Sequence, residues 1–194
     1  MTRNMDHVPV PSQTVGPFFH LGCTDRHCVG SLVGEKTKGE RIGLKICVFD
    51  GEDMAVPDAM IEIWQADAEG KYSHPDDPQS AMADPGFKGF GRMPTNEHGC
   101  CSFETIRPGQ VAANDGGKQA SHFNISVFAR GILKRLATRA YFGGDPALNQ
   151  DPVMALVPQE RQKTLLLQSS PEGPGEWYFE IRLCGEKETV FFDV

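Results

Sequence analysis

The chain has 194 residues, a length at which all-β sandwiches often form one domain and bury a core without disulfides or structural metal ions. Its 19 basic and 26 acidic side chains give a net charge of -7, so it offers no cationic field to nucleic acid. No stretch approaches the roughly 20 apolar residues that span a bilayer, and the start shows no signal- or transit-peptide composition. We therefore expect one cytoplasmic domain, with neither nucleic acid nor membrane as a partner.

Residues 1–40 differ in pattern from the remainder of the chain. They are rich in proline near the start, lack a helical period, and hold the apolar cluster Pro-Phe-Phe at 17–19, just after Gly16. This composition predicts an extended arm whose apolar residues cover another surface. We expect an N-terminal arm and interface segment over 1–40 and a β-sandwich over 41–194, together forming one domain.

Short runs rich in β-branched and aromatic residues begin at Arg41 and are separated by Gly, Pro and Asp. In the clearest run, 176–185, the side chains of Trp177, Phe179 and Ile181 occupy alternate positions. Such alternation is typical of an antiparallel sheet with one face in a core. The predicted strands are 41–50, 59–67, 122–131, 138–144, 176–185 and 188–194. The fold class predicted is an all-β, antiparallel β-sandwich with long loops.

The segments between the predicted strands are mostly loops. Residues 72–91 and 107–121 are polar and rich in Gly and Pro, and long loops on a sandwich often carry function. From Asp151 onward the pattern allows at most a short helix or turn, because Pro158 interrupts it.

The six cysteines are scattered and show no CxxC spacing. Cys47 and Cys184 lie in apolar runs, where a reduced thiol acts as a small hydrophobic group. A cytoplasmic chain seldom keeps structural disulfides. We therefore expect no chemistry from the cysteines.

The histidines give little support for a metal site. No two of the six stand at the i, i+2 strand spacing or the i, i+4 helix spacing that aims two imidazoles at one ion. His122 opens a predicted strand after a long loop, but its same-face neighbour is Asn124. For His122 alone, a hydrogen-bonded structural role is favoured over metal ligation. The sequence also contains no nucleophile elbow or phosphate-binding loop.

Arg130 ends an apolar strand beside Gly131. A guanidinium placed there can point into a cleft and pair bidentately with a carboxylate. It can equally form a salt bridge at the rim of the sheet. The residues alone leave both interpretations open.

Several motifs occur in a fixed order over nearly the whole chain. They are PSQTVGPFF (11–19), MIEIWQADAEGKYSHP (60–75), DPGFKGFGR (84–92), SFETIRPG (102–109), HFNISVFARG (122–131), TRAYFGGDP (138–146) and GEKETVFFDV (185–194). Together they resemble the intradiol ring-cleaving dioxygenases, and only 22–40 reads as unlike that family. The resemblance implies a β-sandwich and, on the catalytic subunit of heteromeric members, a non-haem ferric ion held by two tyrosines and two histidines.

Carried over position by position, the resemblance implies that this chain lacks three of the four iron ligands. Gln79 and Val111 stand where the two tyrosines would be, and the histidine pair becomes His122 and Asn124. Gln119 replaces an arginine that usually precedes the pair. Because Gln and Val supply no phenolate, we expect no iron on this chain and non-haem Fe(III) on a partner β subunit.

The resemblance also implies a substrate pocket shared with that partner. Thr14, Gly16 and Pro17 of the TxGP segment, together with Arg130, would wall the pocket, which takes a small aromatic substrate and O2. We expect a higher-order αβ oligomer. Two alternatives stay open: a non-catalytic β-sandwich scaffold, and a homomeric catechol or hydroxyquinol dioxygenase, against which the lost ligands argue.

Overall fold

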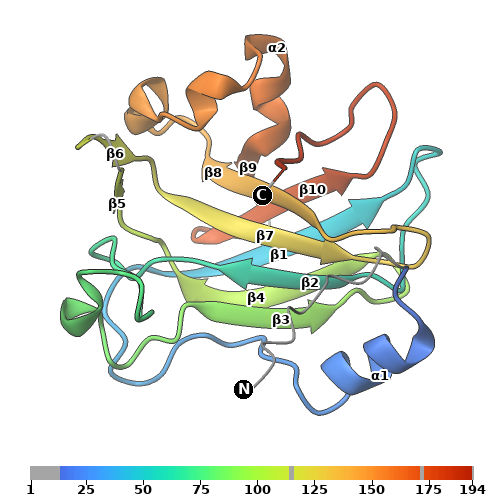
Figure 1. The fold of residues 1–194 in the computed structure, drawn as a ribbon, viewed down its shortest axis with the longest axis horizontal. Coiled ribbons are helices and arrows are strands. Elements are labelled where there is room, and N and C mark those ends of the chain that lie inside the picture. The colour runs from blue at the N-terminus through green and yellow to red at the C-terminus, as the bar shows by residue number, and fades with distance from the viewer. Residues whose placement is uncertain (1–13, 114–115, 171–172, 194) are drawn as a thin grey trace, which may run out of the picture.

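The computed structural model describes residues 14–113, 116–170 and 173–193, and most of its regular structure is β-strand (Figure 1). The strands are β1 (Arg41–Phe49), β2 (Met60–Trp64), β3 (Phe90–Pro94), β4 (Cys100–Ile106), β5 (Val111–Ala112), β6 (Lys118–Gln119), β7 (His122–Phe128), β8 (Leu136–Phe142), β9 (Leu166–Ser169) and β10 (Glu176–Arg182). The helices are α1 (Pro17–Thr24) and α2 (Gln159–Gln162), with the 3-10 turns η1 (Ser80–Met82), η2 (Pro146–Gln150), η3 (Met154–Leu156) and η4 (Lys163–Leu165). None of these helices is long and apolar enough to cross a bilayer.

Eight strands form one sheet in the order β3-β2-β7-β8-β9-β10-β1-β4, which folds over on itself as a nearly closed sandwich. Five of the seven pairings are antiparallel, as predicted, whereas β1 with β10 and β8 with β9 are parallel. β1 and β10 lie far apart in the sequence, and helical turns connect β8 to β9. The residue pattern of a single strand does not reveal the direction of such a partner. The β-sandwich class is thus confirmed, with a mixed rather than purely antiparallel sheet.

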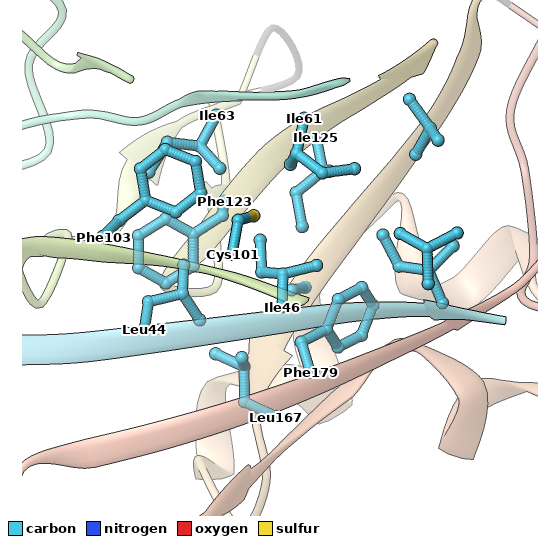
Figure 2. Close-up of a cluster of buried hydrophobic side chains, with 14 of the residues drawn as sticks. Leu44, Ile46, Ile61, Ile63, Cys101, Phe103, Phe123, Ile125, Leu167 and Phe179 are labelled. Atoms are coloured by element: carbon cyan, nitrogen blue, oxygen red, sulfur yellow. The ribbon is translucent and has the colours of Figure 1, made fainter. Parts of the chain in front are cut away.

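The inward faces of the sheet meet in one apolar core, shown in Figure 2. Alternate residues of each strand supply it, as the two-residue period of a strand requires. The labelled members include Leu44 and Ile46 of β1, Ile61 and Ile63 of β2, Phe103 of β4, Phe123 and Ile125 of β7, and Phe179 of β10. Burying each such side chain stabilises the fold by roughly 1.5–3 kcal/mol. The alternation predicted for 176–185 is confirmed, since Phe179 and Ile181 are buried.

Residues 29–33 join the two edges of the sheet. The backbone of Val29 exchanges two hydrogen bonds with Arg92 of β3, at 2.8 and 3.0 Å. On the other side, the backbone of Glu104 in β4 donates to Gly30 and accepts from Leu32. The Leu32 side chain is only 3% exposed and packs in the core. A segment that looked unlike the family therefore helps to close the sandwich.

The prediction of a fully extended N-terminal arm is wrong for 17–24, which forms α1. Gly16 caps this helix in an extended conformation, and Pro17 occupies its first turn, where its fixed φ suits a helix and no backbone donor is lost. The eight-residue helix is too short to show a clear period in the sequence. The first part of the arm, 1–13, lies outside the described residues.

Other differences concern short elements. The predicted strand 188–194 is wrong within the described residues, because it contributes only an isolated bridge between Phe192 and Ala137. The predicted loop 107–121 contains the two-residue strands β5 and β6, which pair with each other. The expected short helix or turn after Asp151 is confirmed as η3, α2 and η4.

The cysteine prediction also needs correction. Cys47 in β1 and Cys100 in β4 are directly opposite each other in the antiparallel pair and form a disulfide. They are 53 residues apart in sequence, so only the strand register brings them together. Cys184 is a free thiol but is exposed, and Cys101 is buried.

Candidate functional site

Strand β7 connects two regions that carry the candidate residues. His122 and Asn124 lie at its start, and Arg130 lies just beyond its end. At about 3.3 Å per residue of extended chain, Arg130 is up to about 26 Å from His122 and up to about 20 Å from Asn124. Figure 1 shows β5 and β6 near the first end of β7 and α1 toward the other end. The candidate residues therefore form two separate groups.

The first group surrounds a cavity of about 440 Å³, here called the Gln79 pocket. Its lining includes Trp64, Tyr72, His74, Asp77, Gln79 and Val111. Two of the four positions that the resemblance assigns to iron ligands, Gln79 and Val111, thus line the same cavity. Asn124 joins them through its side-chain amide, which donates to the hydroxyl of Tyr72 at 3.2 Å.

The loop that carries Gln79 is held by the carboxylate of Asp77. One oxygen accepts the backbone N–H of Tyr72 at 2.8 Å, and the other accepts the backbone N–H of Gln79 at 2.7 Å. Such side-chain acceptance of backbone donors lets a short polar residue fix a turn. Asp77 therefore fixes the loop backbone at two of the residues that line the pocket.

His122 lies at the start of β7 and is 2% exposed. Its Nδ1–H donates to the carbonyl of Ala120 at 2.7 Å, which is the hydrogen bond expected of a structural histidine. Burial, together with the positive charge of Arg139, lowers the pKa of His122 to about 4. The imidazole is therefore neutral at physiological pH.

Arg139 and Tyr141 of β8 complete the polar groups around His122, and neither was predicted as a site residue. Arg139 donates from Nη1 to the side-chain oxygen of Gln119 at 2.7 Å and to the hydroxyl of Tyr141 at 3.2 Å. The Tyr141 hydroxyl in turn donates to Asp151 at 3.4 Å, and burial raises the pKa of Tyr141 to about 12. Tyr141 is directly opposite His122. The i, i+2 spacing of Arg139 and Tyr141 was the available signal, since it puts both on one face.

These residues do not fit a ferric ion. The four positions provide one imidazole, two amides and an aliphatic side chain, whereas the resemblance implies two phenolates and two imidazoles around a ferric ion. Within the described ranges, no group of three or more His, Cys, Asp or Glu side chains is placed to hold a metal. No chemical step can be assigned to a metal held by these residues.

The second group, here called the Arg130 corner, consists of Thr14, Asp58, Arg130 and Gly131. The hydroxyl of Thr14 accepts the backbone N–H of Gly131 at 2.8 Å, which brings the arm beside Arg130. The Arg130 guanidinium lies 3.1 Å from the carboxylate of Asp58, yet its side chain is 80% exposed. The structure thus brings Thr14 and Arg130 together and shows that Arg130 makes a salt bridge at the rim.

Gly16 and Pro17 follow Thr14 in the sequence, at the start of α1. Gly16 is exposed, and a Cβ added to it would meet no described atom within 4 Å. Its backbone is extended, so no left-handed conformation requires glycine there. The space beside Gly16 is open, and its place as the N-cap of α1 is one where glycine is among the favoured residues.

Comparisons with known proteins agree with this architecture. A family model described as "Dioxygenase" matches residues 15–185. The protocatechuate 3,4-dioxygenase alpha chain of Burkholderia cepacia is 39% identical over 197 residues, which cover 95% of this chain and 96% of the relative. A beta chain of protocatechuate 3,4-dioxygenase from Burkholderia cepacia is 35% identical over 158 residues, covering 78% and 67%.

Among solved structures, catechol 1,2-dioxygenase from Acinetobacter sp. ADP1 superposes with a TM-score of 0.61. The match has 24% identity and covers 78% of this chain and 55% of that structure, so it supports the fold alone. The family model and the alpha-chain relative each span most of this chain. The chain therefore belongs to the intradiol ring-cleaving dioxygenases, a family of non-haem iron enzymes.

Proposed function

We propose that this chain is the α subunit of a heteromeric protocatechuate 3,4-dioxygenase. The complex would cleave protocatechuate with O2 to 3-carboxy-cis,cis-muconate, with the iron held by the β subunit. The observation that carries the proposal is the likeness to an alpha chain over nearly the full length of both proteins. The substitutions at Gln79, Val111 and Asn124 support it, because a chain without these ligands needs a partner that has them.

In this proposal the Arg130 corner is the wall that the chain adds to the partner's pocket. The Thr14 bond to Gly131 sets the position of the arm relative to Arg130. An exposed ion pair such as Arg130 with Asp58 contributes only about 0–1 kcal/mol. Arg130 can therefore exchange Asp58 for the carboxylate of protocatechuate at little cost, in a charge-assisted hydrogen bond.

The division of roles follows from what each chain holds. Fe(III) on the β subunit would supply the electrophilic centre for the catechol oxygens, and this chain would orient the ring through its carboxylate. Gly16 and Pro17 would border the ring where the backbone is open to close approach. We place the assembly in the cytoplasm as a higher-order αβ oligomer.

The test is co-expression with the β subunit, followed by oxygen-uptake kinetics on protocatechuate and on catechol, which lacks the carboxylate. Loss of a hydrogen bond to a charged group costs about 1.5–3 kcal/mol, so Arg130→Ala should raise the KM for protocatechuate about 10- to 100-fold. Its effect on catechol should be less than about threefold. Arg135→Ala, in the same exposed loop, is the matched control and should change neither.

Unchanged kinetics on both substrates in the Arg130→Ala complex would refute the role of Arg130. The two alternative functions give other outcomes. A scaffold would leave the activity of the β subunit the same with or without this chain. A homomeric dioxygenase would bind iron and consume O2 without any partner.

A further inference from the structure

The Gln79 pocket has the size and lining of a ligand site in its own right. Its volume of about 440 Å³ lies within the range of small-molecule sites. We propose that this pocket binds a small aromatic amine, a flat ring that carries one ammonium group. The proposal concerns a site separate from the Arg130 corner and does not depend on the proposed function.

The first argument is a ready-made stacking surface. The rings of Trp64 and Tyr72 lie 5.6 Å apart and nearly parallel, at 14°. His74 meets the Trp64 ring edge-on, with centroids 6.2 Å apart. Asn124 holds the Tyr72 hydroxyl, and β2 holds Trp64 next to β7, so the surface is built before a ligand arrives. Aromatic pairs of this kind contribute about 0.5–1.5 kcal/mol beyond the area they bury.

The second argument is the sign of the charge around the cavity. Its described lining contains the carboxylates of Asp76 and Asp77 and no lysine or arginine. Both oxygens of Asp77 accept backbone N–H groups, which fixes that negative charge in place. The Asp76 carboxylate is 93% exposed and lies 3.7 Å from His74, so it is free to approach a bound cation. An ammonium is favoured here, and a carboxylate such as that of protocatechuate is disfavoured.

Arg139 is the nearby cation that must be considered. It is committed to Gln119 and Tyr141 through its Nη1 atom and is not part of the described lining. The Trp64 face adds attraction for a cation, by about 0.5–1 kcal/mol at exposed sites. The charge of the side chains at the open side of the pocket is therefore negative overall.

The third argument is a polar group that can donate a hydrogen bond to a substituent on the ligand ring. The Tyr72 oxygen accepts from Asn124, which leaves the Tyr72 proton available for donation. Burial raises the pKa of Tyr72, so the phenol keeps this proton at neutral pH. Val111 and Ala112 supply an apolar wall on the lining. A hydroxylated ring with an ammonium side chain matches all three features.

The test uses the full-length chain and three probes of nearly equal size. Tyramine carries an ammonium, 4-ethylphenol is neutral, and 3-(4-hydroxyphenyl)propanoate carries a carboxylate. Titration calorimetry should give tyramine an affinity at least about tenfold above that of the propanoate, with 4-ethylphenol between them. Trp64 fluorescence in a Trp177→Phe background should report the same order, because Trp177 packs on Phe142, away from the pocket lining.

Two variants locate the binding. Asp76→Asn should remove at least about half of the free-energy preference for tyramine over the propanoate. Its control is Glu97→Gln, another highly exposed carboxylate, which lies 3.5 Å from His98 in the turn between β3 and β4. Val111→Tyr should fill the cavity and abolish binding of all three probes. Equal affinity for the three probes, no binding of any of them, or tyramine binding unaffected by Val111→Tyr would overturn the proposal.

Discussion

The polar side chains near the two ends of β7 differ in their burial and in their hydrogen-bond partners. At the start of the strand, His122, Gln119 and Asn124 each have a partner inside the chain. Beyond its end, Arg130 and Thr14 are exposed, and Arg130 is held by one surface ion pair. The polar side chains near the start of β7 are thus hydrogen-bonded within the chain, whereas the charge of Arg130 faces outward. On the proposed function, the outward-facing end is the one still used for protocatechuate.

The physical reason for the difference is the cost of burial. A buried polar group without a partner costs about 1–3 kcal/mol, so the polar side chains at this end need hydrogen bonds nearby. Gln119 receives one from Arg139, and Asn124 gives one to Tyr72. The groups at the Arg130 corner are exposed to solvent, so they depend less on their internal partners, Asp58 and Gly131.

The largest expected effect comes from rebuilding the first end. The variant Gln79→Tyr, Val111→Tyr, Asn124→His restores two phenolates and a second imidazole beside His122, so it should bind about one ferric ion per chain. Iron analysis and a tyrosinate charge-transfer band would measure it. The double variant that keeps Asn124 is the control and should bind iron far more weakly. An iron-free triple variant that folds normally would show that Gln79, Val111 and Asn124 are not the ligand positions.

His122 should make stability fall in acid. Its pKa is about 4 when folded and 6.5 when exposed, so the unfolded state takes up the proton first as the pH drops. This contribution to stability is complete above pH 6.5 and is lost between pH 6.5 and 4, by about 3 kcal/mol. Denaturant unfolding at a series of pH values should show this loss. The free energy of unfolding of His122→Asn should depend less on pH over that interval. An equally steep dependence in this variant would show that His122 does not cause the loss.

Thr14 tests whether the second end depends on its internal bond. Thr14→Ala removes the acceptor for Gly131, which should cost about 0.5–1.5 kcal/mol of local stability and raise the KM of the complex a few-fold. Thr14→Ser keeps the hydroxyl and should behave as the wild type. A KM that changes equally in both variants would show that the hydrogen bond is not what positions the arm.

Tyr72 should give the smallest effect on turnover. Tyr72→Phe removes the hydroxyl that accepts from Asn124 and costs about 1 kcal/mol of stability. It should change the kcat/KM of the complex by less than about twofold, because the Gln79 pocket lies far from the Arg130 corner. A large loss of turnover would mean that the two ends of β7 do not differ in the way described.

Much of the fold could be predicted from local patterns. The alternation in β10 and the apolar runs of β1, β2, β7 and β8 report burial of one or both faces, which is a property of each strand by itself. The short helix α1 and the bridging segment 29–33 could not be found in this way. Their structure depends on the two open edges of the sheet and on caps, which have no period in the sequence.

The candidate sites likewise contain residues that could be predicted from the sequence and residues that could not. The resemblance assigned Gln79, Val111 and Asn124 to iron-ligand positions, which stays a prediction. The structure places Gln79 and Val111 on the lining of one cavity and links Asn124 to it through Tyr72. Arg139 was missed because its partner Gln119 lies on β6, a strand that only the tertiary structure brings beside β8. The Cys47–Cys100 disulfide was missed for a related reason, since pairing of β1 with β4 is a tertiary event.

The most direct test of the central claim is a paired measurement of iron content and protocatechuate-dependent oxygen uptake. It compares the purified chain alone with the same chain co-expressed with the β subunit. The account predicts a colourless, iron-free, inactive chain alone and a reddish-brown, active complex in which iron is stoichiometric with the β subunit. A coloured chain that consumes oxygen without any partner would contradict the account.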